Sequence, residues 1–201
     1  STKFYDSDFY VDSRVLIPRP ETELLVDYVI KNFKDTLKVL DAGTGSGCIG
    51  ISIALKKPNF KVYGSDFSKN ALDVALINKS KLNVGNFFLV NANWLSCFKN
   101  ESFDLILSNP PYIAENDLHL DSLIHEPKIA LTSSEAGLSD IKKIIQDSSK
   151  ILKRSGVLII EHGCNQEDQV KKLLKDNYFL DISNIKDYQG LPRITYGVLD
   201  K

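Results

Sequence analysis

The stretch from residue 37 to residue 57 limits most strongly what this chain can fold into. An apolar segment, residues 37–42, runs directly into Gly43-Thr44-Gly45-Ser46-Gly47, and a second apolar segment starts at Cys48. Strand, glycine loop and helix in this order bring main chain close to a bound nucleotide, because glycine has no Cβ to keep the ligand away. The loop lacks the Lys-Ser/Thr pair of a triphosphate-binding loop, which argues against a triphosphate site.

Apolar strand-like and helix-like segments alternate along the rest of the chain. This alternation predicts an α/β fold, a doubly wound, Rossmann-like sheet of seven mostly parallel strands. The last two strands, near residues 179–186 and 193–199, follow each other without a helix between them, so the last strand is expected to be antiparallel. Residues 4–15 are rich in aromatic side chains and alternate in character, which predicts a short N-terminal β-hairpin.

Composition restricts the class of protein. The chain has 201 residues, 43% of them hydrophobic and 25% charged, which is typical of one globular domain. A net charge of −1 gives no reason to expect nucleic-acid binding, and no apolar run is long enough for a membrane span. The three cysteines fit neither a zinc spacing nor a disulfide framework, so we expect no metal and a reduced, cytoplasmic protein.

The chain begins at Ser1 and contains no methionine, which suggests that a longer N-terminal region precedes it. We expect residues 1–35, the hairpin and a linking helix, to be the remnant of that region. Residues 36–201 are expected to form the main domain.

Polar side chains follow the second and third predicted strands. Asp66 ends the second strand about 20 residues after the glycine loop, a position that suits ribose hydroxyls; capping the next helix is the alternative. Asn93 and Trp94 follow the third strand and suit an adenine ring, although Trp94 would also serve as an apolar plug beneath the loop.

The fourth strand, residues 103–108, ends at Asn109-Pro110-Pro111-Tyr112. Two prolines cannot donate to a ladder, so the strand must stop there in a stiff loop. The Asn109 amide oxygen and the Pro110 carbonyl can together accept both hydrogens of a planar NH2 group, and Tyr112 can cover it with an aromatic face. A plain strand-ending turn is the alternative.

Two other segments are candidates for the walls of a site. Residues 16–23, Leu-Ile-Pro-Arg-Pro-Glu-Thr-Glu, form a proline-stiffened loop that suits a lid. Residues 113–137 show no clear period, and so long an irregular stretch is usually functional, so we expect it to wall a pocket beside Tyr112.

Together these motifs resemble those of class I S-adenosylmethionine-dependent methyltransferases, and most closely those of the HemK-type protein-glutamine methyltransferases. The resemblance runs from about Phe9 to Leu199. Its most specific marks are residues 16–23 and Ser108 to Ile113, while the glycine loop is shared by many families. It implies that residues 36–201 form a methyltransferase domain. It further implies a substrate, the glutamine in the Gly-Gly-Gln loop of peptide chain release factors, which receives a methyl group on its side-chain amide.

The resemblance also implies roles for particular residues. S-adenosylmethionine, which leaves as S-adenosylhomocysteine, would be bound by Gly43, Thr44, Gly45, Ser46, Gly47, Asp66, Asn93, Trp94 and Asn109. The substrate glutamine would be held by Asn109, Pro110, Pro111 and Tyr112, of which Asn109, Pro110 and Tyr112 would be catalytic. The chain departs from the family at Asn93, where an acidic residue is usual, and in lacking an N-terminal helical domain that helps to dock the release factor.

Other classes compete with this interpretation. A DNA adenine or rRNA base methyltransferase also acts on a planar NH2 group, but it needs a basic nucleic-acid surface. A nicotinamide-dependent oxidoreductase fits the glycine loop and Asp66 but leaves residues 109–112 unexplained. A non-catalytic cofactor-binding module is the remaining alternative.

Overall fold

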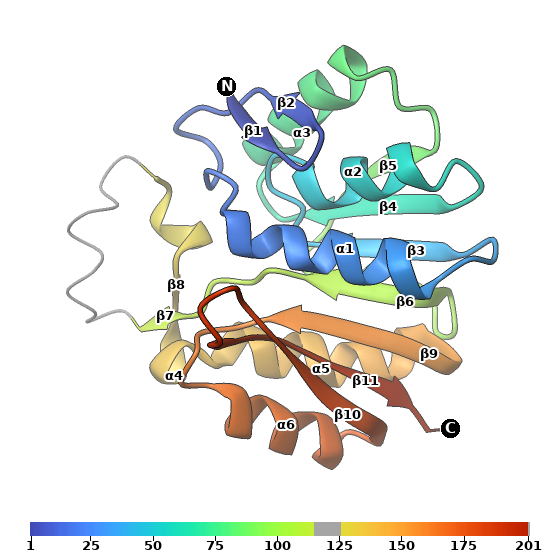
Figure 1. Cartoon of the computed structure of the whole chain (residues 1–201), viewed down its shortest axis with the longest axis vertical. Coiled ribbons are helices and arrows are strands. Elements are labelled where there is room, and N and C mark those ends of the chain that lie inside the picture. Colours follow the sequence, from blue (N-terminus) through green and yellow to red (C-terminus); the bar gives the residue numbers. More distant parts are fainter. Residues whose placement is uncertain (115–125, 201) are drawn as a thin grey trace.

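The computed structural model describes residues 1–114 and 126–200. A seven-stranded sheet in the order β10-β11-β9-β6-β3-β4-β5 forms its centre (Figure 1). In chain order these strands are β3 Lys38–Ala42, β4 Lys61–Asp66, β5 Phe87–Asn91, β6 Phe103–Ser108, β9 Leu152–Glu161, β10 Phe179–Lys186 and β11 Pro192–Leu199. An antiparallel hairpin, β1 Thr2–Phe4 and β2 Ser7–Phe9, precedes the sheet.

Strand directions follow the prediction. Neighbouring strands are parallel from β5 through β4, β3 and β6 to β9. The last strand, β11, is antiparallel to both β9 and β10 because β10 and β11 join without a helix between them. The predicted α/β class, the seven mostly parallel strands, the antiparallel last strand and the N-terminal hairpin are all confirmed.

Helices cover both faces of the sheet. On one face, α1 Glu23–Asn32 and α2 Cys48–Lys56 share a core with the N-terminal hairpin, and Figure 1 shows α1 crossing in front of the sheet. On the other face, α5 Ser139–Ile151 packs its apolar side against β9, and α6 Glu167–Asp176 packs against β10 and β11. The sheet is therefore buried on both faces, which explains its continuous apolar strands.

Shorter elements surround the carboxyl ends of the strands. They are η1 Pro20–Thr22, β7 Ile113–Ala114, η3 Lys128–Ala130, β8 Thr132–Ser133 and α4 Ser134–Gly137. The longer helix α3 Lys69–Lys81 packs against β5 and β4. The stretch predicted to be irregular, residues 113–137, thus contains short elements in its described parts, while residues 115–125 lie outside the described residues. Within the described residues, no helix combines the length and the apolar character that a bilayer crossing requires.

Two element boundaries depend on local irregularities. The chain enters α1 through the 3-10 turn η1, and the α-helix itself starts at Glu23, because Pro20 stiffens the entry. Strand β9 starts at Leu152, which pairs with Phe103, and a register shift then absorbs the turn residues that follow.

Candidate functional site

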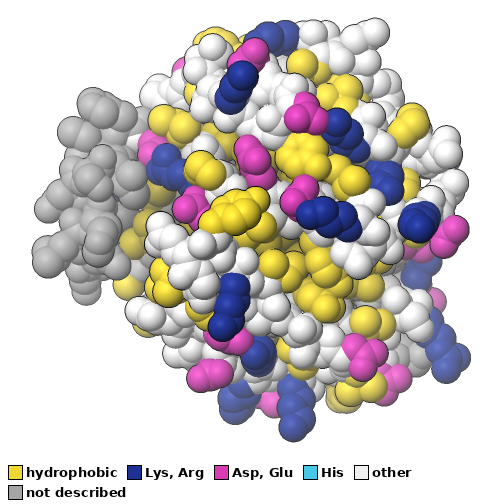
Figure 2. Space-filling view, in the orientation of Figure 1, with side chains coloured by type: hydrophobic (Ala, Val, Ile, Leu, Met, Phe, Trp, Pro, Cys, Tyr) yellow, Lys and Arg dark blue, Asp and Glu magenta, His cyan; other side chains and the backbone are white. Residues whose placement is uncertain are grey.

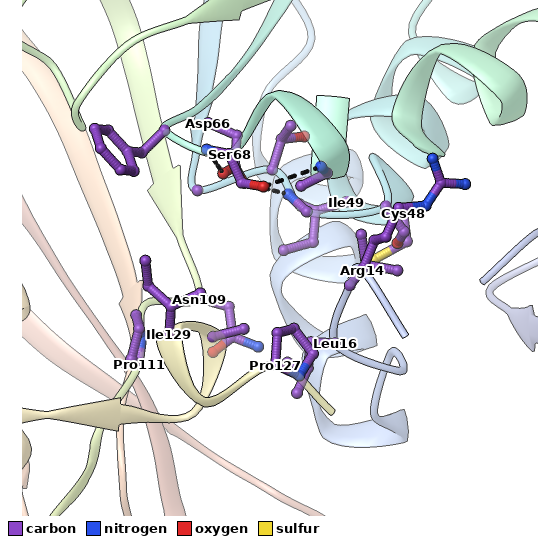
Figure 3. A pocket seen from close by; sticks show the side chains of 18 of the residues that line it. Arg14, Leu16, Cys48, Ile49, Asp66, Ser68, Asn109, Pro111, Pro127 and Ile129 are labelled. Atoms are coloured by element: carbon purple, nitrogen blue, oxygen red, sulfur yellow. Dashed lines mark hydrogen bonds between the residues drawn. The ribbon is translucent and has the colours of Figure 1, made fainter. Parts of the chain in front are cut away.

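A cavity of about 310 Å³ opens where the central parallel strands end, between the glycine loop and the segment after β6 (Figure 3). Ligands in open α/β sheets bind at this edge. Asp66 and Asn109 lie on opposite sides of the cavity in Figure 3. Of the residues predicted to bind the cofactor, it is lined by Gly43, Thr44, Gly45, Ser46, Asp66, Asn93, Trp94 and Asn109.

The glycine loop is fixed from below by a buried carboxylate. Asp41, the fourth residue of β3, accepts a hydrogen bond from the Thr44 hydroxyl at 2.6 Å and another from the main-chain N–H of Gly50 at 3.0 Å. Burial raises the pKa of Asp41 to about 6. The carboxylate therefore ties the end of the strand to both the loop and the first turn of α2.

Gly47 does not line the cavity. It begins α2 as its N-cap with φ of +82°, and an added Cβ would come within 2.8 Å of the Ile51 side chain. The structure therefore gives Gly47 a role in the turn and in helix packing, whereas its predicted cofactor contact stays a prediction.

Asp66 organises the rim of the cavity opposite Asn109. One carboxylate oxygen accepts from the Gly45 N–H at 2.9 Å and the other from the Ser68 N–H at 2.9 Å. Burial raises the pKa of Asp66. A carboxylate offers about four acceptor positions, so two remain for vicinal hydroxyls of a sugar. The N-cap of α3 is Ser68, whose hydroxyl accepts from the Ala71 N–H, so the helix-capping alternative for Asp66 does not hold.

Trp94 lies beside the glycine loop. A Cβ added at Gly43 would meet its ring at 2.8 Å, so the absence of a side chain there lets the indole approach the main chain. Its N–H donates to Asp140 Oδ1 at 3.1 Å, and both Asp140 and the exposed Asn93 line the cavity. Asp140 was not foreseen from the sequence, since it enters the site only because α5 packs back against the sheet.

Asn109 is held by a residue far away in the sequence. Its side-chain NH2 donates to the Thr22 hydroxyl at 3.1 Å, and Thr22 is 2% exposed at the end of η1. With its nitrogen turned toward Thr22, the amide directs its oxygen to the other side. Thr22 also lines the cavity, and it belongs to residues 16–23, the segment predicted to be a wall of the site.

A second, smaller hollow of about 80 Å³ lies next to the first. Pro110 and Tyr112 line this hollow and not the larger cavity, whereas Asn109 and Pro111 line both. The four residues predicted to bind the substrate thus surround one space, and Asn109 with Pro111 forms part of the boundary between it and the cavity beside the glycine loop.

Glu161 lies beneath this boundary, at the carboxyl end of β9. It is 1% exposed, and its Oε1 accepts from the Tyr112 hydroxyl at 3.4 Å. Burial raises its pKa to about 7, while interactions with the Thr22 hydroxyl and with Arg193 act in the opposite direction. Burial, with the Glu161 charge second, also raises the pKa of Tyr112 above its ordinary value.

The proline-stiffened loop closes over the site through an ion pair. Arg19 Nη2 lies 2.6 Å from Glu126 Oε1, and the N–H of Ile17 donates to the other carboxylate oxygen at 2.9 Å. The Glu126 side chain is only 7% exposed. The ion pair therefore joins, at the rim of the cavity, two segments that are 107 residues apart in the sequence. Pro18 on one side and Pro127 on the other line the cavity.

The cavity fits an adenosine-type cofactor. Its walls are largely apolar, its size lies at the lower end of ordinary ligand pockets, and Asp66 supplies acceptors for a ribose. At Gly45, with φ of +54°, an added Cβ would meet no atom within 4 Å, so the loop leaves open space where a ligand can approach the main chain. Arg14 and Phe67 also line the cavity and were not foreseen from the sequence, whereas Ile129 and Thr132 belong to the stretch 113–137 that was predicted to wall a pocket.

Comparison with known proteins identifies the family. A family model described as "Methyltransferase domain" matches residues 33–191. Release factor glutamine methyltransferase of Coxiella burnetii is 36% identical over 96% of this chain and 70% of its own length. The protein of the same name from Buchnera aphidicola subsp. Schizaphis graminum is 40% identical over 97% of this chain and 72% of its own. The chain belongs to the release factor glutamine methyltransferase family.

Solved structures agree with this assignment. A release-factor-specific protein-(glutamine-N5) methyltransferase from Alicyclobacillus acidocaldarius is 28% identical, with a TM-score of 0.56 over 96% of this chain and all of its own. A methyltransferase from Pyrococcus furiosus has a TM-score of 0.73 at 17% identity, over 96% of this chain and 89% of its own. At that identity, the second likeness concerns the fold alone.

Proposed function

We propose that the protein transfers the methyl group of S-adenosylmethionine to the side-chain amide nitrogen of the glutamine in the Gly-Gly-Gln motif of peptide chain release factors. The observation that carries this proposal is the shared boundary of the two hollows. The larger one suits the cofactor and the smaller one suits the planar amide of a glutamine. Asn109 borders both, so it lies where a methyl donor and an amide acceptor would meet.

The chemical problem is that an amide nitrogen is a poor nucleophile, because its lone pair is delocalised into the carbonyl. When bound, S-adenosylmethionine supplies an activated methyl group on a positively charged sulfur. Asn109 Oδ1 and the Pro110 carbonyl each accept one N–H of the glutamine, which fixes the nitrogen in line with that methyl group. Orientation of this kind can contribute about 7–11 kcal/mol. The two oxygens also favour the positive charge that develops on nitrogen, and the proton can leave after transfer.

Tyr112 completes the acceptor site in this proposal. Its ring borders the smaller hollow, and its hydroxyl is tied to buried Glu161. A ring held in this way can stack on the flat glutamine amide and keep water from it. On the cofactor side, Asp66 binds the ribose, while Trp94 and Asn93 border the adenine.

Nucleic-acid methylation is the alternative, since adenine also presents a planar NH2 group. The family assignment and the charge distribution favour the protein substrate. The net charge is −1, and Figure 2 shows lysine and arginine side chains intermixed with acidic ones on one face of the molecule. A duplex-binding surface needs clustered positive charge. We also propose a reducing, cytoplasmic setting, which is supported by the free cysteines Cys48, Cys97 and Cys164.

The test is a methyl-transfer assay with radiolabelled S-adenosylmethionine and three acceptors: a release factor, duplex DNA and ribosomal RNA. We expect label in the release factor only, and none when its Gly-Gly-Gln glutamine is replaced by alanine. Tandem mass spectrometry should locate one methyl group on that glutamine. Label in either nucleic acid together with an unmodified release factor would overturn the proposal.

A further inference from the structure

Asn109 can accept a hydrogen bond from a substrate N–H only if its amide oxygen, and not its amide nitrogen, faces the smaller hollow. The two ends of a carboxamide have nearly the same size, so packing alone selects neither orientation. The selection must come from the partner on the other side, which is the Thr22 hydroxyl. A hydroxyl can both donate and accept, so it does not by itself enforce one orientation.

Glu161 lies where it can fix the direction in which the Thr22 hydroxyl donates. Strands β6 and β9 are parallel with Ser108 opposite Ile160, so the next residues along each strand are Asn109 and Glu161. The Glu161 carboxylate is buried, and an interaction with the Thr22 hydroxyl lowers its pKa. Its Oε2 has no hydrogen-bond partner in residues 1–114 and 126–200, so this buried oxygen still has acceptor capacity.

We propose that Glu161 is a positioning residue that sets the orientation of the catalytic amide through Thr22. In this proposal the Oε2 of the ionised carboxylate, which is unpaired within the described residues, takes the hydrogen of the Thr22 hydroxyl, so Thr22 can only accept from Asn109. The NH2 of Asn109 is thereby held toward Thr22, and its oxygen is held toward the substrate. The same carboxylate accepts from the Tyr112 hydroxyl, so one buried charge fixes both sides of the acceptor hollow. This inference rests on the proposed function.

Protonation of Glu161 would remove this control. A neutral carboxyl group can itself donate to Thr22, which frees the threonine hydrogen to point at Asn109 and allows the amide to turn over. Because burial raises the pKa of Glu161 to about 7, methyl transfer should fall as the pH decreases through 7. At higher pH the carboxylate is ionised and the productive orientation is held.

Other charged or titratable groups face Glu161 from the elements around it, but those with shifted pKa values are shifted away from neutrality. Burial raises the pKa of Cys48 to about 12 and raises that of Tyr112, while it lowers the pKa of His162. The groups concerned are Glu21 on η1, Cys48 on α2, Tyr112 after β6, Arg193 on β11 and His162 beside Glu161 itself. Among these groups, Glu161 is therefore the one expected to control an inflection near pH 7.

The kinetic test compares single-turnover methyl transfer from pH 6 to 9 in the wild type, Glu161→Gln, Thr22→Val and the double variant. We expect each single substitution to lower the rate at pH 8 about tenfold, the scale of one charge-assisted hydrogen bond. The double variant should be no slower than either single variant, because all remove the same chain of contacts. The inflection near pH 7 should disappear, and affinity for S-adenosylmethionine should stay within about twofold.

Thr22→Ser is the matched control, since it keeps the hydroxyl and should keep both the rate and the pH profile. If Glu161→Gln does not fold, the rates and pH profiles of Thr22→Val and Thr22→Ser still test the proposal. Wild-type rates in Glu161→Gln, or an unchanged inflection in Thr22→Val, would overturn the inference.

A readout without catalysis separates this inference from the proposed function. In protein labelled with ¹⁵N-asparagine, the side-chain NH2 signals of Asn109 should shift with an inflection near pH 7 that Glu161→Gln abolishes. Such an inflection in a protein that methylates no release factor would overturn the function and leave the positioning role standing. Methylation by a protein whose Asn109 signals do not titrate would do the reverse.

Discussion

Asp66 and Asn109 face the same cavity, yet they are held by different kinds of contact. Asp66 binds the Gly45 N–H, 21 residues away, within one strand–loop–helix–strand unit that Asp41 pins from below. Asn109 binds Thr22, 87 residues away. Beyond it, Arg19 reaches Glu126 across 107 residues. The glycine-loop and ribose part of the cofactor site is thus built locally with main-chain groups, and the acceptor half is assembled from distant segments.

Because of this difference, mutations should be able to impair the cofactor half and the acceptor half of the site separately. Damage to the local unit should weaken cofactor binding, whereas damage to a distant contact should leave the cofactor bound and misplace the acceptor. Substitutions that change either the dissociation constant of the cofactor or kcat, but not both, are therefore the sharpest tests of the comparison.

The largest effect is expected for Asn109→Ala. Loss of the amide oxygen removes one of two acceptors that orient the substrate nitrogen, so kcat should fall about 100-fold or more. The dissociation constant of S-adenosylmethionine should change by less than about threefold, as measured by calorimetry. The exposed Asn100→Ala is a matched control and should be silent. A variant that keeps its turnover but loses the cofactor would break the division between the halves.

Asp66→Asn should show the opposite pattern. The neutral amide loses charge-assisted acceptors for the ribose, and the dissociation constant of the cofactor should rise about 10- to 100-fold. At saturating cofactor, kcat should stay within a few-fold of the wild type. Asp73→Asn, on the exposed side of α3, provides the control. Unchanged cofactor affinity in Asp66→Asn would contradict the ribose role.

The Arg19–Glu126 ion pair tests how far the acceptor half depends on distant contacts. Among residues 1–114 and 126–200, Arg19→Gln leaves the mostly buried Glu126 carboxylate with the Ile17 N–H alone, so KM for the release factor should rise about tenfold. In a double-mutant cycle, adding Glu126→Gln should recover part of the loss, because the uncompensated charge is then gone. Strictly additive losses would mean that the two side chains do not act as a pair.

The smallest effect is expected in the glycine loop itself. Gly45 has φ of +54°, so Gly45→Ala should lower the free energy of unfolding by about 1–2 kcal/mol. At Gly85 an added Cβ also meets nothing within 4 Å, but the backbone there is not left-handed. Gly85→Ala should therefore be neutral or slightly stabilising. Urea unfolding of the pair measures the strain, and equal stabilities would show that the left-handed turn carries no cost.

The features that could be predicted from the sequence are those formed by residues close together along the chain. Alternating apolar segments predict the sheet, and its strand ends locate Asp66, Trp94 and Asn109 near one edge. The glycine loop is recognisable because its function requires missing side chains at fixed spacing. These features are encoded within about 30 neighbouring residues each, the size of one βαβ unit.

The sequence did not predict the contacts between segments that are distant along the chain. Thr22, Glu126 and Asp140 reach the site because η1, the segment before η3 and α5 fold over the strand ends. No spacing in the sequence reports such contacts. One signal was present for Glu161: an acidic residue that closes a long apolar strand is a buried charge in need of partners. Its hydrogen-bond partner Tyr112, however, lies 49 residues away.

The most direct test of the account is a structure of the protein with S-adenosylhomocysteine and a Gly-Gly-Gln peptide. The measured quantities are the distances from the glutamine side-chain nitrogen to Asn109 Oδ1 and to the Pro110 carbonyl oxygen. We predict about 2.8–3.1 Å for both, with the cofactor against the glycine loop and the nitrogen facing its sulfur. A glutamine bound outside the smaller hollow, or one whose nitrogen contacts neither oxygen, would contradict the account.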